Sequence, residues 1–367
     1  MSKKRVLIFQ QFLAPYRIDL LNDLCATFDA RVLIMFTGRA GQAFDQKQLA
    51  SDVMFIPCSL SHGGLLGQMK DVLEEIATFD PDLVIVPEFN HLAVAAVLRR
   101  SFSKKKYRVI SICDDSFDMV SGNEFTLRHR IARRIVAPHL DEIVSVEPRV
   151  AKWYEREYGH GYFFPIIKDE FRARLAYKDS LSLKQGLVDT YGLAGKRVFL
   201  FVGRLVKLKN VDTLIRAFSR YENKDSLLVI VGDGPEHQYL MDLSSGLDCN
   251  IVFTGFLEGP ELNVWYNIAQ VFVLPSYQEA FGAVTNEALI AGCSCLVSDK
   301  AGSQCLIKDG VNGYVFDSRD EDDLGRKLSL AGSLACDVVP DGELRKSKML
   351  VDYRTSVNAL INHLNSL

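Results

Sequence analysis

Short apolar runs, separated by longer amphipathic stretches, are the main pattern along this chain. The runs occupy residues 5–10, 31–36, 53–58, 82–88, 107–113 and 141–146 in the first part and 197–203, 226–232, 250–255, 271–275 and 294–299 in the second. Runs this apolar, with helices between them, indicate parallel strands buried on both faces. The pattern therefore predicts two α/β units, each a doubly wound sheet with right-handed crossovers.

The break between the two units is expected after Pro165, where a charged stretch extends to about Lys196 and has weak strand character. This stretch is interpreted as a connector that contains helix. Near the C-terminus, apolar residues recur at helical spacing: Val357, Leu360, Ile361 and Leu364. We expect Rossmann-like domains at 1–168 and 169–350, facing each other across a cleft, and a helix at 351–367 that returns to the first domain.

Composition is that of a globular protein, with 48% hydrophobic and 24% charged residues. A net charge of -3 argues against a general nucleic-acid binder. No apolar stretch reaches 18 residues, and the run after the basic start is too short for a signal peptide. Any membrane contact is therefore expected to be peripheral.

The cysteines indicate a reducing compartment. They form no C-x-x-C pair, and none has the spacing to histidine that zinc sites use. Most lie in apolar contexts, so we interpret them as buried reduced thiols of a cytosolic protein. They are Cys25, Cys58, Cys113, Cys249, Cys293, Cys295, Cys305 and Cys336.

Three strand ends in the second half carry candidate binding groups. Gly203, Arg204 and Lys209 follow one strand, where the two cations suit a diphosphate, although a solvated basic loop has the same spacing. The glycine-rich turn at 232–236 lacks the third glycine of a dinucleotide fingerprint, which disfavours an oxidoreductase. Phe256 and Leu257 offer an apolar surface for a base, or they belong to the core.

The segment "SYQEAFGAVTNEALIAG" places Glu279 before a predicted helix and Glu287 about one turn inside it. Backbone N–H groups at the start of a helix have no partner within the helix, so the amides of Phe281, Gly282 and Ala283 predict an anion site. Either glutamate alone is compatible with a solvated carboxylate, but both flanking one helix start favour a ligand site.

The second half resembles the donor-binding half of a retaining GT-B glycosyltransferase of the family-4-like group. The resemblance covers residues 196–317 in detail and rests on "GRLVKLKN", "IVGDGPE", "FTGF", "PSYQEAFGAVTNEALIAG" and "DGVNGYVF" in order. The family's two glutamates, seven residues apart, match Glu279 and Glu287. Its glycine, arginine and lysine element matches Gly203, Arg204 and Lys209.

The resemblance implies the transfer of a hexosyl-type sugar, with retention of configuration, from a UDP- or GDP-linked donor to an acceptor hydroxyl. Arg204, Lys209 and the amides at 281–283 would stabilise the leaving diphosphate. Glu287 would bind the ribose and Glu279 the sugar. No metal or other cofactor is expected, because the candidate for a D-x-D metal motif, at 320–322, is interpreted as solvated.

The first half departs from the family's usual pattern. It has neither the glycine-rich loop after the first strand nor the histidine that many relatives show after the strand at 107–113. Tyr16 and Arg17 resemble the "P-Y-R" start of a subgroup and are expected on the acceptor side. The polar partner of the reacting sugar is expected to be Asp114, Asp115 or His91, although a helix cap is the commoner role for a residue placed like His91.

A basic helix in the first half suggests a membrane partner. Arg130, Arg133 and Arg134 share roughly one face of a predicted helix, which suits anionic lipid headgroups but also a solvated surface. The expected setting is assembly of a bacterial surface polysaccharide or lipid-linked oligosaccharide at the cytoplasmic face of a membrane. The alternatives are a GT-B-fold sugar-nucleotide epimerase and a noncatalytic nucleotide-sugar-binding protein.

Overall fold

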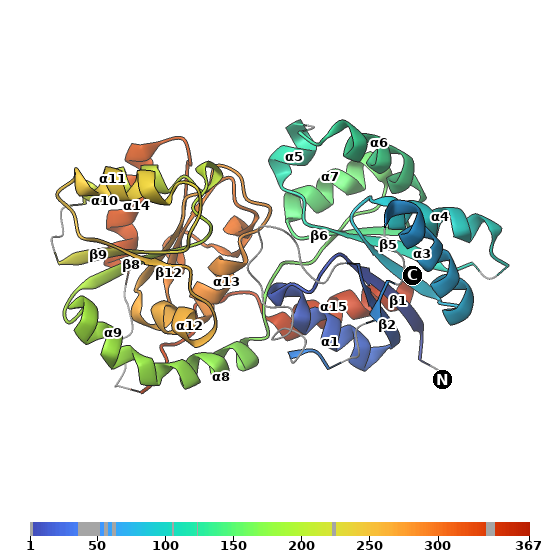
Figure 1. Ribbon diagram of the computed structural model, residues 1–367, viewed down its shortest axis with the longest axis horizontal. Coiled ribbons are helices and arrows are strands. Elements are labelled where there is room, and N and C mark those ends of the chain that lie inside the picture. The colour runs from blue at the N-terminus through green and yellow to red at the C-terminus, as the bar shows by residue number, and fades with distance from the viewer. Residues whose placement is uncertain are drawn as a thin grey trace. The chain divides into compact units, whose positions relative to one another are not determined.

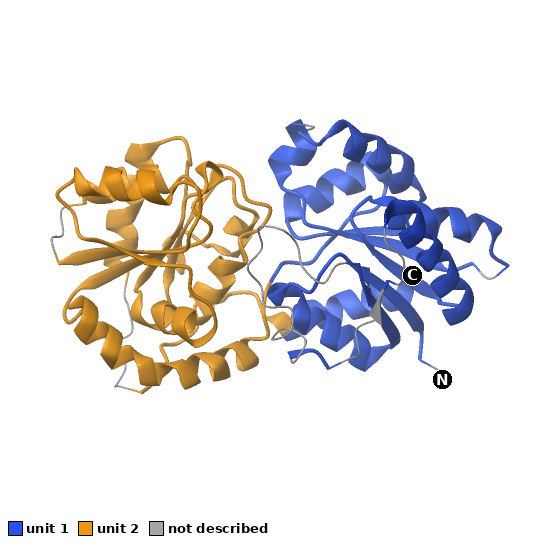
Figure 2. Ribbon diagram, viewed as in Figure 1, with its two compact units in different colours: residues 1–166, 354–367 blue, residues 167–353 orange. Residues whose placement is uncertain are grey.

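The chain folds into two compact units, one formed by residues 1–166 with 354–367 and the other by residues 167–353 (Figures 1 and 2). The boundaries expected from the sequence were at 168/169 and 350/351. The computed structural model describes residues 3–35, 52–54, 58–60, 64–104, 106–122, 124–221, 225–334 and 342–367.

Unit 1 is built on a parallel sheet in which β1 and β4 are central neighbours. The strand pairs of the described residues in this sheet are all parallel, as is typical of α/β sheets buried on both faces. In the part of the chain that the structure describes, the strand order is β3 (Cys58–Ser59), β2 (Asp29–Ile34), β1 (Arg5–Gln10), β4 (Leu83–Pro87), β5 (Arg108–Cys113), β6 (Glu142–Ser145) and β7 (Tyr162–Phe163).

The helices of unit 1 cover both faces of its sheet. One face packs into a continuous apolar core with α3, α4 and α7, while α1 and α15 lie on the other side (Figure 1). The helices are α1 (Ile18–Thr27), α3 (Gly64–Phe79), α4 (His91–Phe102), α5 (Phe117–Gly122), α6 (Leu127–Val136), α7 (Pro148–Tyr158) and α15 (Tyr353–Ser366).

Unit 2 repeats this arrangement with β8 and β11 as central neighbours. Its pairs are also parallel. Among the described residues the strand order is β10 (Ile251–Gly255), β9 (Ser226–Val231), β8 (Arg197–Val202), β11 (Val271–Leu274), β12 (Ser294–Ser298) and β13 (Gly313–Phe316). The two sheets confirm the predicted doubly wound α/β class.

Helices also enclose the sheet of unit 2. The core on one face contains side chains of α10 and α14, and α12 packs with α8 on the other face (Figure 1). The stretch interpreted as a connector forms α8 (Glu170–Ser180) and α9 (Lys184–Tyr191). The other helices are α10 (Val211–Ser219), α11 (His237–Ser245), α12 (Gly259–Ile268), α13 (Ala283–Ile290) and α14 (Glu321–Ser333).

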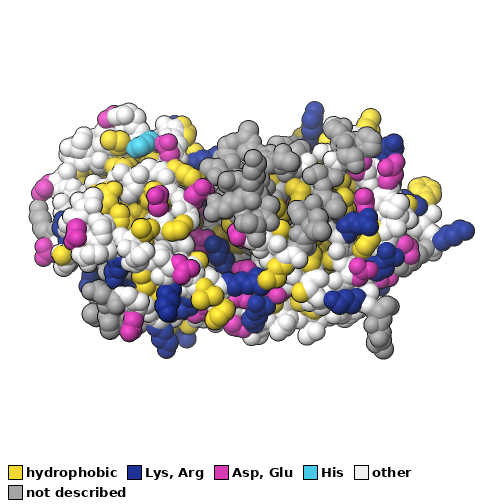
Figure 3. Space-filling view, turned by 60° about the horizontal axis from the view of Figure 1, so that its bottom comes forward, with side chains coloured by type: hydrophobic (Ala, Val, Ile, Leu, Met, Phe, Trp, Pro, Cys, Tyr) yellow, Lys and Arg dark blue, Asp and Glu magenta, His cyan; other side chains and the backbone are white. Residues whose placement is uncertain are grey.

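The charged side chains are of mixed sign on the surface (Figure 3), and the described cysteines are free thiols. Lys and Arg side chains are interspersed with Asp and Glu side chains on the face shown in Figure 3. Cys113, Cys293 and Cys295 are buried free thiols, and burial raises the pKa of the half-buried Cys25 to about 11. Cys336 and the side chain of Cys58 lie outside the described residues. Within the described ranges, no helix has the length and apolarity needed to cross a membrane.

Candidate functional site

Each sheet has one point where the strand order reverses, between β1 and β4 in unit 1 and between β8 and β11 in unit 2. The loops that follow these strands diverge to opposite faces of the sheet, which leaves a crevice at the carboxyl ends of the strands. Tyr16 and Arg17 follow β1, and Lys209 and Glu279 follow β8 and β11. The predicted residues therefore gather at both of these positions.

Lys209 is held by a short turn that is anchored to the neighbouring strand ends. A 3-10 helix at Lys207–Lys209 ends at Asn210, which has a left-handed backbone with φ 54°. The buried Asn210 Nδ2 donates to the carbonyl oxygens of Pro275 at 3.1 Å and Ser318 at 3.2 Å. This amide therefore fixes the turn beside the end of β11. The sequence analysis missed Asn210, although asparagine is among the few residues other than glycine that are enriched in the left-handed region.

Lys209 and Glu279 are 70 residues apart in sequence and form an ion pair in the structure. Both side chains are mostly buried. The backbone of Glu279 is also fixed, because its N–H donates to Lys300 O at 3.3 Å and its carbonyl accepts from Gly302 N at 3.2 Å. The two side chains that the sequence assigned to phosphate and sugar thus lie together at one strand end.

The N-terminus of α13 lies directly against this pair. Gly282 precedes the helix with φ 92°, and a Cβ there would lie 2.5 Å from Leu274 Cδ2 and 3.3 Å from Glu279 Cγ. Only glycine therefore fits. Phe281 anchors the turn with its ring, which is 1% exposed. The amides of Phe281, Gly282 and Ala283 donate no hydrogen bond to any described residue, so the positive end of the helix is available to an anion.

The glycine-rich turn after β9 packs directly on the end of β8. A Cβ on Gly232 would lie 1.9 Å from the carbonyl oxygen of Gly203, a distance that no side chain tolerates. The amide of Gly232 donates to Gly255 O at 2.8 Å, and that of Gly203 donates to Val231 O at 3.0 Å. This turn fixes the ends of β8, β9 and β10 and positions the loop that begins with Gly203.

Three further residues of the predicted donor site are accessible. Arg204 is exposed and forms no ion pair with a described residue. Phe256 is 52% exposed and Leu257 is half-buried. The alternative that Phe256 belongs to the core is therefore wrong, because half of its surface remains accessible to a ligand.

Glu287 contacts side chains that the sequence analysis did not identify. Its Oε1 lies 2.6 Å from Lys168 Nζ, and its Oε2 accepts from the hydroxyl of Tyr266 at 2.9 Å. The hydroxyl of Tyr177 donates to its backbone carbonyl at 3.1 Å. Among the described residues, no hydrogen bond or ion pair joins Glu287 to Glu279 or Lys209, so the two glutamates occupy separate polar environments. No motif in the sequence identifies Lys168 or Tyr266 as partners of Glu287.

The carboxyl ends of β1, β4 and β5 enclose a cavity of about 220 Å³ in unit 1. Arg17, which is 6% exposed, forms an ion pair with Asp114. The hydroxyl of Tyr16 donates to Asp114 Oδ2 at 3.3 Å. The pKa of Tyr16 is raised mainly by burial and, to a smaller extent, by the negative charge of Asp114. The cavity is lined by Gln10, Gln11, Phe12, Ala14, Tyr16, Arg17, Pro87, Glu88, Ile112 and Asp114.

Glu88 is a member of this cavity that the sequence analysis missed. Its φ of 54° is left-handed, which is uncommon for glutamate. Its N–H donates to Ile112 O at 3.1 Å and its carbonyl accepts from Ser111 Oγ at 2.8 Å. Neighbouring strand β5 therefore holds the strained backbone that brings Glu88 to the cavity. Such strain is concentrated at functional sites, and φ is not readable from a sequence.

Two candidates for the sugar's polar partner do not line the cavity. Asp115 is 4% exposed and accepts a 2.5 Å hydrogen bond from Tyr154, and its burial raises its pKa to about 6. His91 bonds Gln68 Oε1 at 2.8 Å, and Asn90 rather than His91 caps α4. The structure therefore favours Asp114. Asp115 is a buried hydrogen-bond acceptor for Tyr154. The interpretation of His91 as a helix cap is wrong, because Asn90 caps α4.

Two of the three arginines of α6 that were predicted to contact lipid are exposed. Arg130 and Arg134 are exposed. Arg133 is buried, with its guanidinium 4.5 Å from the ring centre of Phe125 and 5.0 Å from that of Trp153. The prediction that Arg133 contacts lipid is therefore wrong, because its charge is stacked between rings of the core.

The acidic cluster at 320–322 begins a helix. Asp320 caps α14 by accepting from the amide of Asp323 at 2.9 Å, and that bond lowers the pKa of Asp320. Within the described residues, no group of three His, Cys, Asp or Glu side chains has an arrangement that could hold a metal ion.

Residues 190–334 match the family described as glycosyl transferases group 1. An uncharacterized glycosyltransferase of Methanocaldococcus jannaschii is 37% identical over 149 residues, which are 39% of this chain and 37% of that protein. A GDP-mannose-dependent alpha-mannosyltransferase of Corynebacterium glutamicum is 38% identical over 125 residues, 34% of this chain and 29% of that protein. The matches span about a third of the length of these relatives.

Solved structures extend the likeness to the whole chain and show its fold. The Anabaena protein HepE, in complex with UDP and glucose, superposes with a TM-score of 0.73 at 17% identity, covering 99% of this chain and 100% of HepE. A sucrose-phosphate synthase of Thermosynechococcus elongatus gives 0.71 at 15% identity and covers 99% of both chains. The fold is that of the GT-B glycosyltransferases, as the resemblance predicts.

Proposed function

We propose that the protein is a glycosyltransferase that moves a hexosyl-type sugar from a nucleotide diphosphate sugar to an acceptor hydroxyl with retention of configuration. One observation carries the proposal. Lys209 and Glu279 are paired at the strand-order reversal of unit 2, beside helix amides without hydrogen-bond acceptors in the described structure. A cation and a helix N-terminus suit a diphosphate, and a carboxylate suits sugar hydroxyls.

Stabilisation of the leaving group is the main catalytic contribution. The diphosphate gains negative charge as the bond to the sugar breaks. Lys209, the accessible Arg204 and the amides at 281–283 would meet this charge without reorganising, which is the most effective form of electrostatic catalysis. The proposal therefore assigns no metal ion to the reaction, and the phosphate accepts the acceptor's proton during attack on the same face of the sugar.

The two glutamates have different proposed roles. Glu279 would exchange part of its contact with Lys209 for a hydroxyl of the donor sugar. Glu287 is assigned to the ribose, and its oxygens keep lone pairs for hydroxyl donors beside Lys168 and Tyr266. Phe256 and Leu257 would pack against the base. The name of the Corynebacterium relative supports a GDP-linked donor, and the UDP complexes of HepE support a UDP-linked one.

The cavity of unit 1 is proposed to bind the acceptor. Asp114 accepts from Tyr16 and pairs with Arg17, so its carboxylate has a defined position from which to orient a hydroxyl. Glu88 adds a second carboxylate to the same cavity. Two carboxylates and a phenol suit a polyhydroxylated acceptor, such as the growing end of a surface polysaccharide or a lipid-linked saccharide.

Peripheral membrane contact is proposed for α6. Leu127, Ile131 and Ile135 are exposed at intervals of four residues, and Arg130 and Arg134 flank them. An exposed apolar stripe beside cations favours the interface of an anionic bilayer. Flotation with phosphatidylglycerol vesicles tests this contact: Ile131→Glu should abolish binding, and equal binding by the variant would refute it.

The proposed reaction is tested by a matched pair of lysine variants. Lys207 and Lys209 lie in the same 3-10 turn, but only Lys209 pairs with Glu279. A thermal-shift panel of nucleoside diphosphates and their sugars should identify one donor, and acceptor-dependent release of nucleotide then measures transfer. Lys209→Met should lose donor binding and turnover, whereas Lys207→Met should retain both. Equal donor binding and turnover in the two variants would contradict the assignment of Lys209. A donor that binds without acceptor-dependent turnover would favour a noncatalytic binding protein.

A further inference from the structure

A second cavity in unit 1, of about 400 Å³, lies at the edge of the sheet opposite to the acceptor cavity. Pro81 and Tyr107 border it and precede β4 and β5, whereas Glu88 and Asp114 follow those strands. The five residues of β4 separate the two edges by about 17 Å, at roughly 3.3 Å per residue. The second cavity is therefore separate from the residues assigned to transfer.

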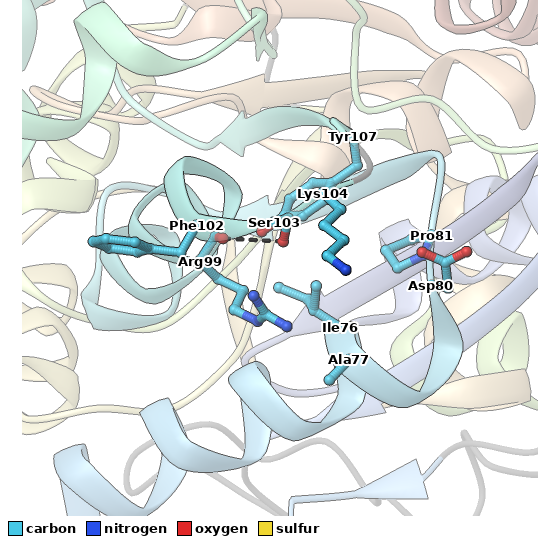
Figure 4. Close-up of a pocket in the computed structure, with 9 residues that line it drawn as sticks. All are labelled: Ile76, Ala77, Asp80, Pro81, Arg99, Phe102, Ser103, Lys104 and Tyr107. Carbon is cyan, nitrogen blue, oxygen red and sulfur yellow. Dashed lines mark hydrogen bonds between the residues drawn. The ribbon is translucent and has the colours of Figure 1, made fainter.

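Two cations without acidic partners converge on this cavity. Figure 4 shows Arg99 from the last turn of α4 and Lys104 from the following loop, both directed toward Ile76 and Ala77 on α3. Neither charged group has an ion pair or hydrogen bond with any described residue. The next residue, Arg100, is fully engaged, because it pairs with Asp141 and bonds His139 O. Two like charges that face one concavity repel each other, and an anion between them removes that repulsion.

The C-terminal ends of two helices border the cavity, and their negative partial charges oppose the positive charge of Arg99 and Lys104. The C-termini of α3 and α4 carry partial negative charges of about half a unit each. The carbonyls at the end of α4 are already met by Lys106, whose Nζ donates to Arg100 O at 3.0 Å and Ser101 O at 3.4 Å. The amide of Asp80 closes α3 by donating to Ile76 O at 3.1 Å. Arg99 and Lys104 are therefore not needed to satisfy these helix ends. The carboxylate of Asp80 also lines the cavity (Figure 4), so the charged side chains of the lining sum to one positive charge.

We propose that Arg99 and Lys104 form a second anion site, which binds the phosphate group of an organic phosphate over an apolar floor made by Ile76 and Ala77. A guanidinium supplies two parallel donors to phosphate oxygens, and an ammonium supplies a mobile charge. The source is either a phospholipid headgroup or a free phosphorylated metabolite, since both present this group. Exposed Phe102 on the rim of the cavity would meet the acyl region in the first case.

The experiment measures binding of glycerol 3-phosphate by calorimetry in a Lys209→Met background, so that phosphate binding at the donor site does not contribute. R99Q/K104Q removes both charges and keeps the side-chain length. The control, K152Q/K178Q, removes two exposed lysines of α7 and α8. We expect R99Q/K104Q to bind about tenfold more weakly or worse, as the loss of charge-assisted bonds implies, and the control to bind like its parent. An unchanged affinity of R99Q/K104Q for glycerol 3-phosphate, or an equal loss of affinity in the control, would overturn the proposal.

Vesicle flotation distinguishes the two sources. The probes are vesicles of phosphatidic acid with phosphatidylcholine, and vesicles of phosphatidylcholine alone. A lipid source predicts that R99Q/K104Q loses binding to the phosphatidic acid vesicles and the control keeps it. A soluble source predicts saturable glycerol 3-phosphate binding with equal flotation of both proteins. Absence of both kinds of binding refutes the proposal, whatever the donor assay shows. A wild-type thermal transition of unit 1, reported by the fluorescence of Trp153 in a Trp265→Phe background, verifies that R99Q/K104Q is folded.

Discussion

Asp114 and Asp115 are neighbours in the chain, but their carboxylates have different surroundings. Asp114 lines the acceptor cavity, and Asp115 is buried with Tyr154. Successive side chains of an extended segment point to opposite sides, so only one of two adjacent residues after β5 can face the cavity. The sequence narrows the choice to this pair, but it cannot select between them, because the selection depends on Arg17 and Tyr154 from distant segments.

The buried Asp115 predicts a specific dependence of stability on pH. Its pKa of about 6 in the folded chain lies above the reference value of 3.8, so the native state holds a proton that the unfolded state releases. This carboxyl therefore lowers the free energy of unfolding as pH rises from about 4 to 6, by roughly 3 kcal/mol in full. Asp115→Asn keeps the hydrogen bond from Tyr154 and removes the titration.

Urea unfolding of both proteins at pH 4 and pH 7 measures the effect. The variant should gain stability relative to the wild type at pH 7, and the gain should vanish near pH 4. A difference that does not change with pH would show that Asp115 does not titrate in this range.

Glu88 predicts a conflict between stability and activity. Replacing a residue in the left-handed region by glycine relieves backbone strain, so Glu88→Gly should raise the free energy of unfolding by up to about 1 kcal/mol. It should also reduce acceptor-dependent turnover, because a carboxylate leaves the cavity. Asp80 has a similar φ of 48° and lies outside that cavity, so Asp80→Gly serves as the control. Loss of turnover in both variants would contradict the assignment of Glu88.

At the scale of elements, the strands with continuous apolar runs were predictable, whereas β7 and β13 were not. Runs such as "RVFLFV" are apolar on both faces and long enough to be identified as buried strands. β7 has two residues, which is too short for a periodic signal, and β13 begins with glycine and is only partly buried. β13 also depends on a close approach, since a Cβ on Gly313 would lie 1.9 Å from Cys295 O. A contact between distant segments has no local signature.

Helix α15 is predicted to stabilise unit 1 although it is the last element of the chain. Val357, Leu360 and Leu364 are buried, and Lys4 Nζ donates to Leu364 O at 2.8 Å. Leu360→Ala should lower the free energy of unfolding of unit 1 by about 2–5 kcal/mol, the usual cost of such a cavity. Asn362→Ala, on the exposed face, should cost little. Chemical denaturation followed by far-UV circular dichroism compares them, and similar midpoints would show that α15 is not a packed part of unit 1.

At the scale of the whole molecule, the two tryptophans provide one reporter for each unit. Trp153 lies in α7 of unit 1, and Trp265 lies buried in α12 of unit 2. The sequence contains no other tryptophan. Each unit has its own apolar core, so unfolding can be followed separately in variants that retain a single tryptophan.

The proposed donor site predicts which reporter responds to nucleotide. In Trp153→Phe, the fluorescence of Trp265 should report a transition that the correct nucleoside diphosphate stabilises, by about 2.7 kcal/mol at a hundredfold excess over Kd. Thermal unfolding with and without nucleotide is compared with that of Trp265→Phe. Stabilisation reported by Trp153 alone would place the nucleotide in unit 1 and contradict the assignment.

The path of the chain through the two units also sets the order in which they can be completed during synthesis. Unit 1 begins with the first residues and receives α15 only after residues 167–353 have been made. At about 5–20 residues per second, that interval lasts roughly tens of seconds. Throughout it, the sheet surface that Val357, Leu360 and Leu364 later cover has no partner from its own chain. The incomplete unit 1 of the nascent chain is therefore the species most exposed to aggregation and to chaperones, whereas unit 2 has its whole sequence before translation ends.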